Sequence, residues 1–154
     1  MTAPHTDAVP RIVVGVDGSA PSLHALRWAV RQAELTGATL DAVIAWQYPV
    51  VVGGLGWVPA TGMDDVDYSE LAAKALSEAV AEVSPPASVH IRQLVVDGNA
   101  AQVLLDAARA ADLLVVGNRG HGGFTDALIG SVSSRCVRHA HCPVVVVHTP
   151  AAKE

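Results

Sequence analysis

Residues 113–123 read Leu-Leu-Val-Val-Gly-Asn-Arg-Gly-His-Gly-Gly, an apolar run followed at once by a glycine-rich loop. The apolar run predicts a buried strand of a parallel sheet. After the loop, residues 130–134 read Gly-Ser-Val-Ser-Ser and predict the start of a helix that ends near His139. Glycines let a backbone approach an anion closely, and the first N–H groups of a helix point toward it. The three segments together therefore predict a phosphate-binding site.

Four more apolar runs predict strands, and three segments between them predict helices. The strands cover 11–16, 39–46, 89–96 and 144–147, and the helices run from a cap at Ser19 to a stop at Gly37, over 68–83 and over 100–111. This alternation predicts right-handed crossovers and an α/β fold, with a doubly wound, five-stranded parallel sheet and helices on both faces. The natural strand order is 3-2-1-4-5. The winding then reverses between the first and fourth strands, which end at Asp17 and Gly117, and a ligand binds beyond those ends.

The chain is long enough for one domain, which we expect to span 11–149, with a flexible leader at 1–10 and a tail at 150–154. Within the domain, glycines and prolines interrupt residues 47–66, where no hydrophobic period is visible. We therefore expect a long loop without regular elements there. A mobile surface loop and a lid over a ligand are the two alternatives for its role.

The composition argues against several kinds of partner. Hydrophobic residues make up 51% of the chain and charged residues only 16%, which fits a sheet buried on both faces. A net charge of -5 argues against nucleic acid or an anionic membrane as the main partner. No signal peptide or membrane-spanning run is visible, so we expect a cytoplasmic protein.

Two cysteines and two histidines lie close together near the end of the chain, at Cys136, His139, His141 and Cys142. Zinc sites use such side chains, but the spacing here matches no standard finger. We therefore expect no metal site, with the thiols in the core and the histidines exposed.

Side chains around the glycine-rich loop extend the predicted phosphate site. The hydroxyls of Ser131 and Ser133 can donate to phosphate oxygens, and Arg119 is the only permanent positive charge in the motif. Asp17 can accept from ligand hydroxyls, help to hold a metal, or cap the following helix locally, and separate oxygens could serve separate roles. The Walker P-loop and dinucleotide patterns are absent from the sequence.

Three motifs carry a family resemblance: Arg-Ile-Val-Val-Gly-Val-Asp-Gly-Ser at 11–19, Gly-x2-Gly-x9-Gly-Ser at 117–131, and His-Cys-Pro-Val-Val-Val-Val at 141–147. Together they resemble the universal stress protein family over nearly the whole chain, and the glycine pattern resembles that of its ATP-binding branch. The resemblance implies an adenine nucleotide α-hydrolase-like fold with ATP as the ligand, with Asp17 and Gly15 at the nucleoside and Trp46 beside adenine. Asn118 departs from the pattern, because the family often has serine there. The candidate binding residues are Gly15, Asp17, Trp46, Gly117, Asn118, Arg119, Gly120, His121, Gly122, Gly123, Gly130, Ser131, Val132 and Ser133.

We expect a nucleotide-dependent regulatory or stress-response module, because the predicted phosphate site has no evident catalytic base poised for water. Two alternatives stay open: a slow ATPase in which Asp17 and Asp126 position a metal such as Mg²⁺ or a water, and a binder of AMP or cyclic AMP. The apolar last strand, Val144 to Val147, would leave an unpaired edge. We therefore expect a homodimer joined by antiparallel pairing of this strand, which the resemblance also implies.

Overall fold

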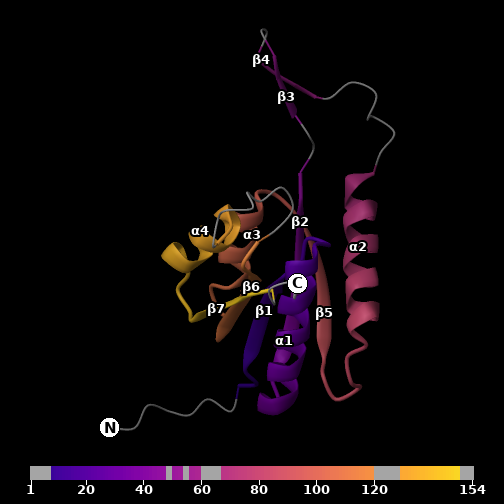
Figure 1. The fold of residues 1–154 in the computed structure, drawn as a ribbon, viewed down its shortest axis with the longest axis vertical. Helices are drawn as coiled ribbons and strands as arrows, with labels where there is room; N and C mark the ends of the chain where they lie inside the picture. The colour runs from indigo at the N-terminus through magenta and orange to yellow at the C-terminus, as the bar shows by residue number, and fades with distance from the viewer. Residues whose placement is uncertain (1–7, 48–49, 54–55, 60–66, 120–128, 150–154) are drawn as a thin grey trace, which may run out of the picture.

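The structure is a computed structural model that describes residues 8–47, 50–53, 56–59, 67–119 and 129–149. Its main sheet contains five parallel strands in the order β5-β2-β1-β6-β7 (Figure 1). The strands are β1 (Arg11–Gly15), β2 (Thr39–Trp46), β5 (Ile91–Asp97), β6 (Leu113–Gly117) and β7 (Val144–Val147). Counted along this sheet alone, the order is 3-2-1-4-5. The predicted doubly wound fold is therefore confirmed.

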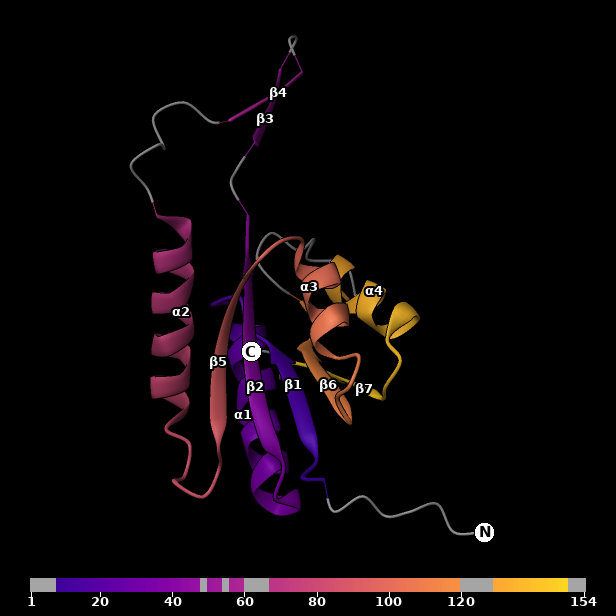
Figure 2. The ribbon, with the colours of Figure 1, turned by 180° about the vertical axis from the view of Figure 1, so that it is seen from behind.

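Helices cover both faces of the sheet (Figures 1 and 2). They are α1 (Ala20–Thr36), α2 (Tyr68–Val83), α3 (Ala100–Ala107) and α4 (Ser131–His139). Residues of α1 and α2 share one core cluster with the sheet, and residues of α3 and α4 share the other. Val13 and Val14, neighbours in β1, belong to different clusters because successive strand residues point to opposite faces. Both are fully buried, as a sheet covered on two sides requires.

Side-chain caps mark where the helices begin. The side chain of Ser19 accepts a hydrogen bond from the Ser22 N–H at the start of α1. Gly37 ends the same helix in the left-handed conformation with φ 73°, which glycine adopts without strain. The predicted cap and stop of α1 are thus confirmed. Asp67 caps α2 and Asn99 caps α3 in the same way as Ser19 caps α1.

Some boundaries differ from those predicted. Strand β1 ends at Gly15 rather than at residue 16. Helix α3 ends at Ala107 rather than at residue 111. The Ala107 carbonyl accepts a hydrogen bond of 3.0 Å from Nη2 of Arg11, and the N–H of Ala111 bonds instead to the Ala108 carbonyl in a tighter turn. Strand β5 lies slightly later than the predicted 89–96, because its pairing with β2 runs from Ile91 to Asp97.

The expectation of no regular elements in residues 47–66 is wrong in part. Strands β3 (Val50–Gly53) and β4 (Gly56–Pro59) pair antiparallel as a small separate sheet. This hairpin lies beyond the end of β2, away from the main sheet (Figures 1 and 2). Of the glycines that indicate an irregular loop, Gly53 ends β3 and pairs with Gly56, which begins β4. Glycine is tolerated there, and the valines that precede it favour an extended strand.

The strand order determines where a ligand can bind. Strands β1 and β6 are hydrogen-bonded neighbours at the centre of the sheet, and the winding reverses between them. Their carboxyl ends therefore form the topological switch point at which such folds bind ligands. Strands β5 and β7 are the two edges of this sheet. In the part of the chain that the structure describes, no helix is long and apolar enough to cross a membrane.

Candidate functional site

The carboxyl end of β6 contacts the first turn of α1. A Cβ on Gly117 would lie 2.8 Å from the backbone carbon and oxygen of Pro21, closer than real Cβ atoms come to other atoms. Glycine at 117 therefore allows the first turn of α1 to pack directly against β6. The contact is a reason for this glycine in addition to the phosphate role predicted from its motif.

Gly117 also contacts the first turn of α4. The hydroxyl of Ser133 is buried and donates a hydrogen bond to the Gly117 carbonyl. The single proton of this hydroxyl is thus used inside the protein in the described structure, and its donation to a phosphate stays a prediction. Ser133 holds the start of α4 against the end of β6.

Asn118, the next residue, connects three segments. Its N–H donates to the Val147 carbonyl at 3.0 Å, and its carbonyl accepts from the Gly130 N–H at 2.6 Å. Its side-chain oxygen accepts from both the N–H and the hydroxyl of Thr149, at 3.4 and 3.3 Å. The residue is only 8% exposed. The amide oxygen thus binds the segment that follows β7, and the role of Asn118 at a ligand stays a prediction.

The N-terminus of α4 presents backbone donors without a side-chain cap. Gly130 is the N-cap residue and has no side chain to accept from the first N–H groups, and the first turn contains no acidic residue. The first N–H groups of any helix lack an acceptor within the helix, and here they lie near the positive end of the helix dipole. Ser131 is exposed at this end, whereas Val132 packs against the core. Backbone groups and the Ser131 hydroxyl can therefore meet an anion here.

Asp17 follows the other central strand and shapes the start of α1. Its Oδ1 accepts from the N–H of Ser19 at 2.9 Å and from the hydroxyl of the same residue. The Asp17 N–H in turn donates to the hydroxyl of Ser22 at 3.2 Å. The local-cap alternative for Asp17 is thus supported. Asp17 is exposed at this end of the sheet.

Gly15 and Trp46 are the last residues of the neighbouring strands β1 and β2. The Cα of Gly15 faces α3, because a Cβ there would lie 2.7 Å from Cδ1 of Leu104. Trp46 is half-buried at the end of β2, separated from β6 by β1, and packs against the core cluster of α1 and α2. Arg119 is half-buried directly after Asn118. The predicted site residues Gly120, His121, Gly122 and Gly123, and Asp126 of the ATPase alternative, lie outside the described residues.

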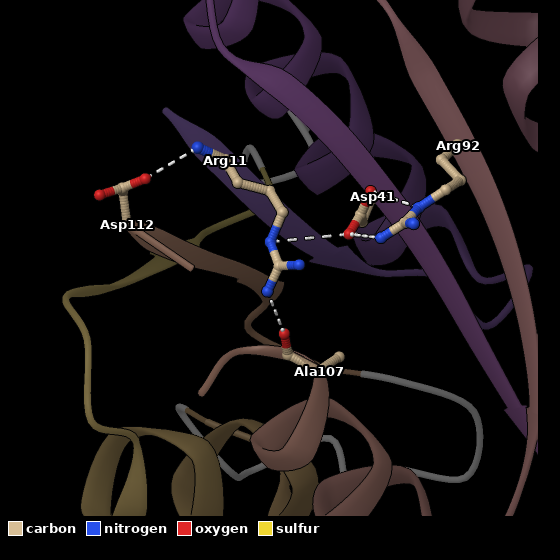
Figure 3. Close-up of polar contacts among 5 residues, drawn as sticks. All are labelled: Arg11, Asp41, Arg92, Ala107 and Asp112. Atoms are coloured by element: carbon tan, nitrogen blue, oxygen red, sulfur yellow. Dashed lines mark hydrogen bonds and ion pairs between the residues drawn. The ribbon is translucent and has the colours of Figure 1, made fainter. Parts of the chain in front are cut away.

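A second polar cluster, which sequence reasoning missed, lies at the opposite end of the sheet (Figure 3). Asp41 of β2 is buried and accepts from Nε and Nη2 of Arg92, at 3.1 and 2.8 Å. Nε of Arg11 lies 3.8 Å from the same carboxylate, and the Arg11 N–H donates to Asp112. Asp41 is the one acidic residue of the mostly apolar strand β2. This feature of the sequence could have indicated a buried ion pair. The cluster ties β1, β2, β5 and α3 together, and its contacts within the protein account for it.

The thiol and histidine group near the end of the chain shows no metal geometry. Cys136 is fully buried, and burial raises the pKa of its thiol to about 11. Burial also raises the pKa of Cys142, with a further contribution from the charge of Asp112. His139 and His141 are exposed. Within the described residues, no group of three or more potential ligands is arranged to hold a metal ion.

The family model and the curated relatives that match this chain all name the same protein family. The family model described as the universal stress protein family matches residues 9–148. A universal stress protein of Mycobacterium tuberculosis is 39% identical over 145 residues, which cover 89% of this chain and 47% of the relative. Another, from Methanocaldococcus jannaschii, is 34% identical over 91% of this chain and 82% of its own length. The chain spans about half the length of the mycobacterial relatives that it matches.

Solved structures share the whole fold. A universal stress protein in complex with cyclic AMP superposes with a TM-score of 0.68 and 29% identity, over 94% of this chain and 100% of the other. The UspA protein of Lactobacillus plantarum gives a TM-score of 0.73 and 25% identity, over 92% and 99% of the two chains. The fold, the family model and the relatives agree with the motifs in the sequence. The chain belongs to the universal stress protein family.

Proposed function

We propose that this chain binds an adenine nucleotide, with ATP as the first candidate, beyond the carboxyl ends of β1 and β6. The observation that carries the proposal is the uncapped N-terminus of α4, which adjoins the end of β6 at the topological switch point. Ser131 and the first N–H groups of α4 bind phosphate, and the exposed carboxylate of Asp17 meets the ribose hydroxyls. Gly117, Asn118 and Ser133 position this turn.

The likeness to the cyclic AMP complex supports an adenine nucleotide as the ligand class. ATP is favoured over a monophosphate by the glycine-rich sequence from Gly117 to Gly123, which offers more backbone donors than one phosphate needs. Mg²⁺ would accompany ATP through phosphate oxygens, with Asp17, which contacts Ser19 at the start of α1, as a candidate carboxylate ligand. Binding of AMP or cyclic AMP is the alternative within this class.

The module is regulatory rather than catalytic in this proposal. A hydrolase needs a carboxylate or imidazole positioned to activate water. One oxygen of Asp17 is already used by Ser19, which favours a structural and binding role over that of a catalytic base. The slow ATPase is the second candidate. It predicts steady phosphate release that disappears in Asp17→Ala while nucleotide binding persists. The proposed module instead binds ATP and releases little phosphate.

Ser131→Asp tests the site without weakening the fold. A negative charge in the first turn of α4 interacts favourably with the helix dipole, so the melting temperature should stay the same or rise. The same charge repels phosphate, so the Kd for ATP measured by calorimetry should rise about tenfold or more. Ser69→Asp adds the same charge to the first turn of α2 and serves as the control. Equal ATP affinity in both variants would contradict the proposed site.

The identity of the ligand is tested on the protein as purified. Denaturation followed by chromatography should release ATP from the wild type and much less from Ser131→Asp. Recovery of ADP would favour the slow ATPase, and recovery of AMP or cyclic AMP the alternative ligand. If no nucleotide is recovered and calorimetry detects no binding of ATP, AMP or cyclic AMP, the proposed function is wrong.

We also propose that two copies pair through β7 and that the protein acts in the cytoplasm. The homodimer is supported by the position of β7 at the edge of the sheet and by its four valines. A four-residue apolar edge invites pairing with another strand. A fusion to a fluorescent protein, imaged in the native cell, tests the location.

A further inference from the structure

Asn118 connects the proposed nucleotide site to the outer edge of the sheet. Its carbonyl accepts from the N–H of Gly130, the residue that precedes α4. Its N–H donates to the carbonyl of Val147, the last residue of β7. A single buried residue thus bonds both to the turn that would hold phosphate and to the strand at the edge.

The side chain of Asn118 strengthens the second of these connections. Its Oδ1 accepts from the N–H and the hydroxyl of Thr149, two residues after β7 ends. Both bonds are long, at 3.4 and 3.3 Å, and the amide is buried. Buried polar groups usually have a partner, and this oxygen has its partner in the segment beyond β7. Asn118 is therefore suited to a positioning role.

We propose that Asn118 couples occupancy of the nucleotide site to the order of β7 and of the segment up to Thr149. The inference rests on the proposed nucleotide binding. An anion at the start of α4 stabilises the first turn of that helix and, with it, the bond from Gly130 to Asn118. Asn118 then holds Val147 and Thr149 in place. Linkage makes this coupling reciprocal. If nucleotide binding strengthens the pairing of β7 with a second copy by some factor, that pairing raises the affinity for nucleotide by the same factor.

The edge position of β7 makes such coupling effective. The strand has four residues and pairs only with β6 in the described sheet. Short edge strands open locally more easily than central strands, so a small gain in free energy changes their exchange with solvent. Strand β5, the opposite edge, ends in Asp97 and lacks a bond to Asn118 among the described contacts. It therefore provides an internal comparison.

Hydrogen exchange measured by mass spectrometry tests the coupling. The full-length protein is compared with and without saturating ATP, at a concentration where sedimentation shows a single species. In the wild type, ATP should slow exchange in the peptide that covers 144–149 about fivefold more than in the peptide that covers 91–97. A general stabilisation by ligand would protect both edges alike.

Variants of Thr149 separate the coupling from the binding. Thr149→Val removes the hydroxyl donor while keeping the shape, so ATP should still bind but protect β7 less. Thr149→Ser keeps the hydroxyl and should restore the wild-type difference. Asn118→Ala removes the acceptor of both bonds and should abolish the selective protection.

The outcomes distinguish this inference from the proposed function. Calorimetry on the same samples reports whether ATP binds. If ATP binds and both edges are protected equally, or if Thr149→Val behaves as the wild type, the coupling is wrong while the nucleotide site stands. If ATP, AMP and cyclic AMP all fail to bind, the proposed function is wrong and the coupling falls with it.

Discussion

Gly117 and Pro21 are packed so closely that any side chain at 117 would meet backbone atoms of α1. The distance from a Cβ at 117 to the Pro21 carbonyl oxygen would be 2.8 Å. Backbone atoms cannot move away by a change of rotamer as side-chain atoms can, so helix α1 itself would have to shift. This glycine in the motif is therefore required by packing, whether or not a nucleotide is bound.

Gly117→Ala should lower the free energy of unfolding by about 2 kcal/mol, the usual effect of overpacking a closed site. Gly15→Ala is the matched control, because its new Cβ would meet mainly the flexible end of the Leu104 side chain, and the loss should be smaller. Urea denaturation followed by circular dichroism measures both. Equal losses would show that α1 adapts to the added methyl group, contrary to the packing argument.

The same residue shows what the sequence could and could not predict. Hydrophobic spacing predicts the main strands and helices, because it is a local signal. The glycines and the helix start after a buried strand predict a phosphate site by the same kind of signal, and that site stays a prediction. The contacts of Gly117 with Pro21 and Ser133 join residues distant in sequence, which no local pattern encodes.

Two further differences have the same kind of cause. The hairpin of β3 and β4 was missed because glycine and proline break helices but are tolerated beside a turn and at a strand end. Asp41 was missed because its partners, Arg11 and Arg92, reach it only across neighbouring strands. An acidic residue inside an apolar strand indicates that a cationic partner lies nearby. The sequence alone does not identify which arginine or lysine that partner is.

Asp41→Ala should destabilise the protein by about 2 kcal/mol. The substitution removes the buried acceptor of Arg92 and the counter-ion of the buried Nε of Arg11. Glu78→Ala breaks an exposed pair with Lys74 and should change stability by less than about 0.5 kcal/mol. The midpoints of urea unfolding at one pH give the comparison. Similar small effects in both variants would mean that the Asp41 cluster contributes no more than a surface pair.

Cys136 should make stability fall at high pH. Burial raises the pKa of its thiol to about 11 from the ordinary value of 9.0, so the unfolded chain loses this proton first. The contribution of the buried, protonated Cys136 thiol to the free energy of unfolding is therefore complete below pH 9 and is lost as the pH rises toward 11. Cys136→Ala should flatten the decline in unfolding free energy between these values, with a remainder from Cys142, whose pKa is also raised. An unchanged slope in Cys136→Ala would contradict this assignment.

The dimer edge can be tested by a substitution that spares the fold. The bonds from Leu114 to Pro143 and from Asn118 to Val147 define the parallel ladder, in which the backbone groups of Val146 point outward. Val146→Pro therefore removes a donor only from the free edge, and proline is accepted on edge strands. We expect a folded protein whose dimer dissociation constant is at least about tenfold higher, measured by sedimentation.

Val145→Pro is the matched control, since the same ladder turns the Val145 N–H inward to Leu114 and its loss should weaken the fold itself. A wild type that sediments as a monomer at tens of micromolar, a concentration range usual for such tests, would exclude a stable β7 dimer. If the wild type is a dimer and Val146→Pro leaves its dissociation constant unchanged, the two copies associate through another surface, and β7 is only an edge.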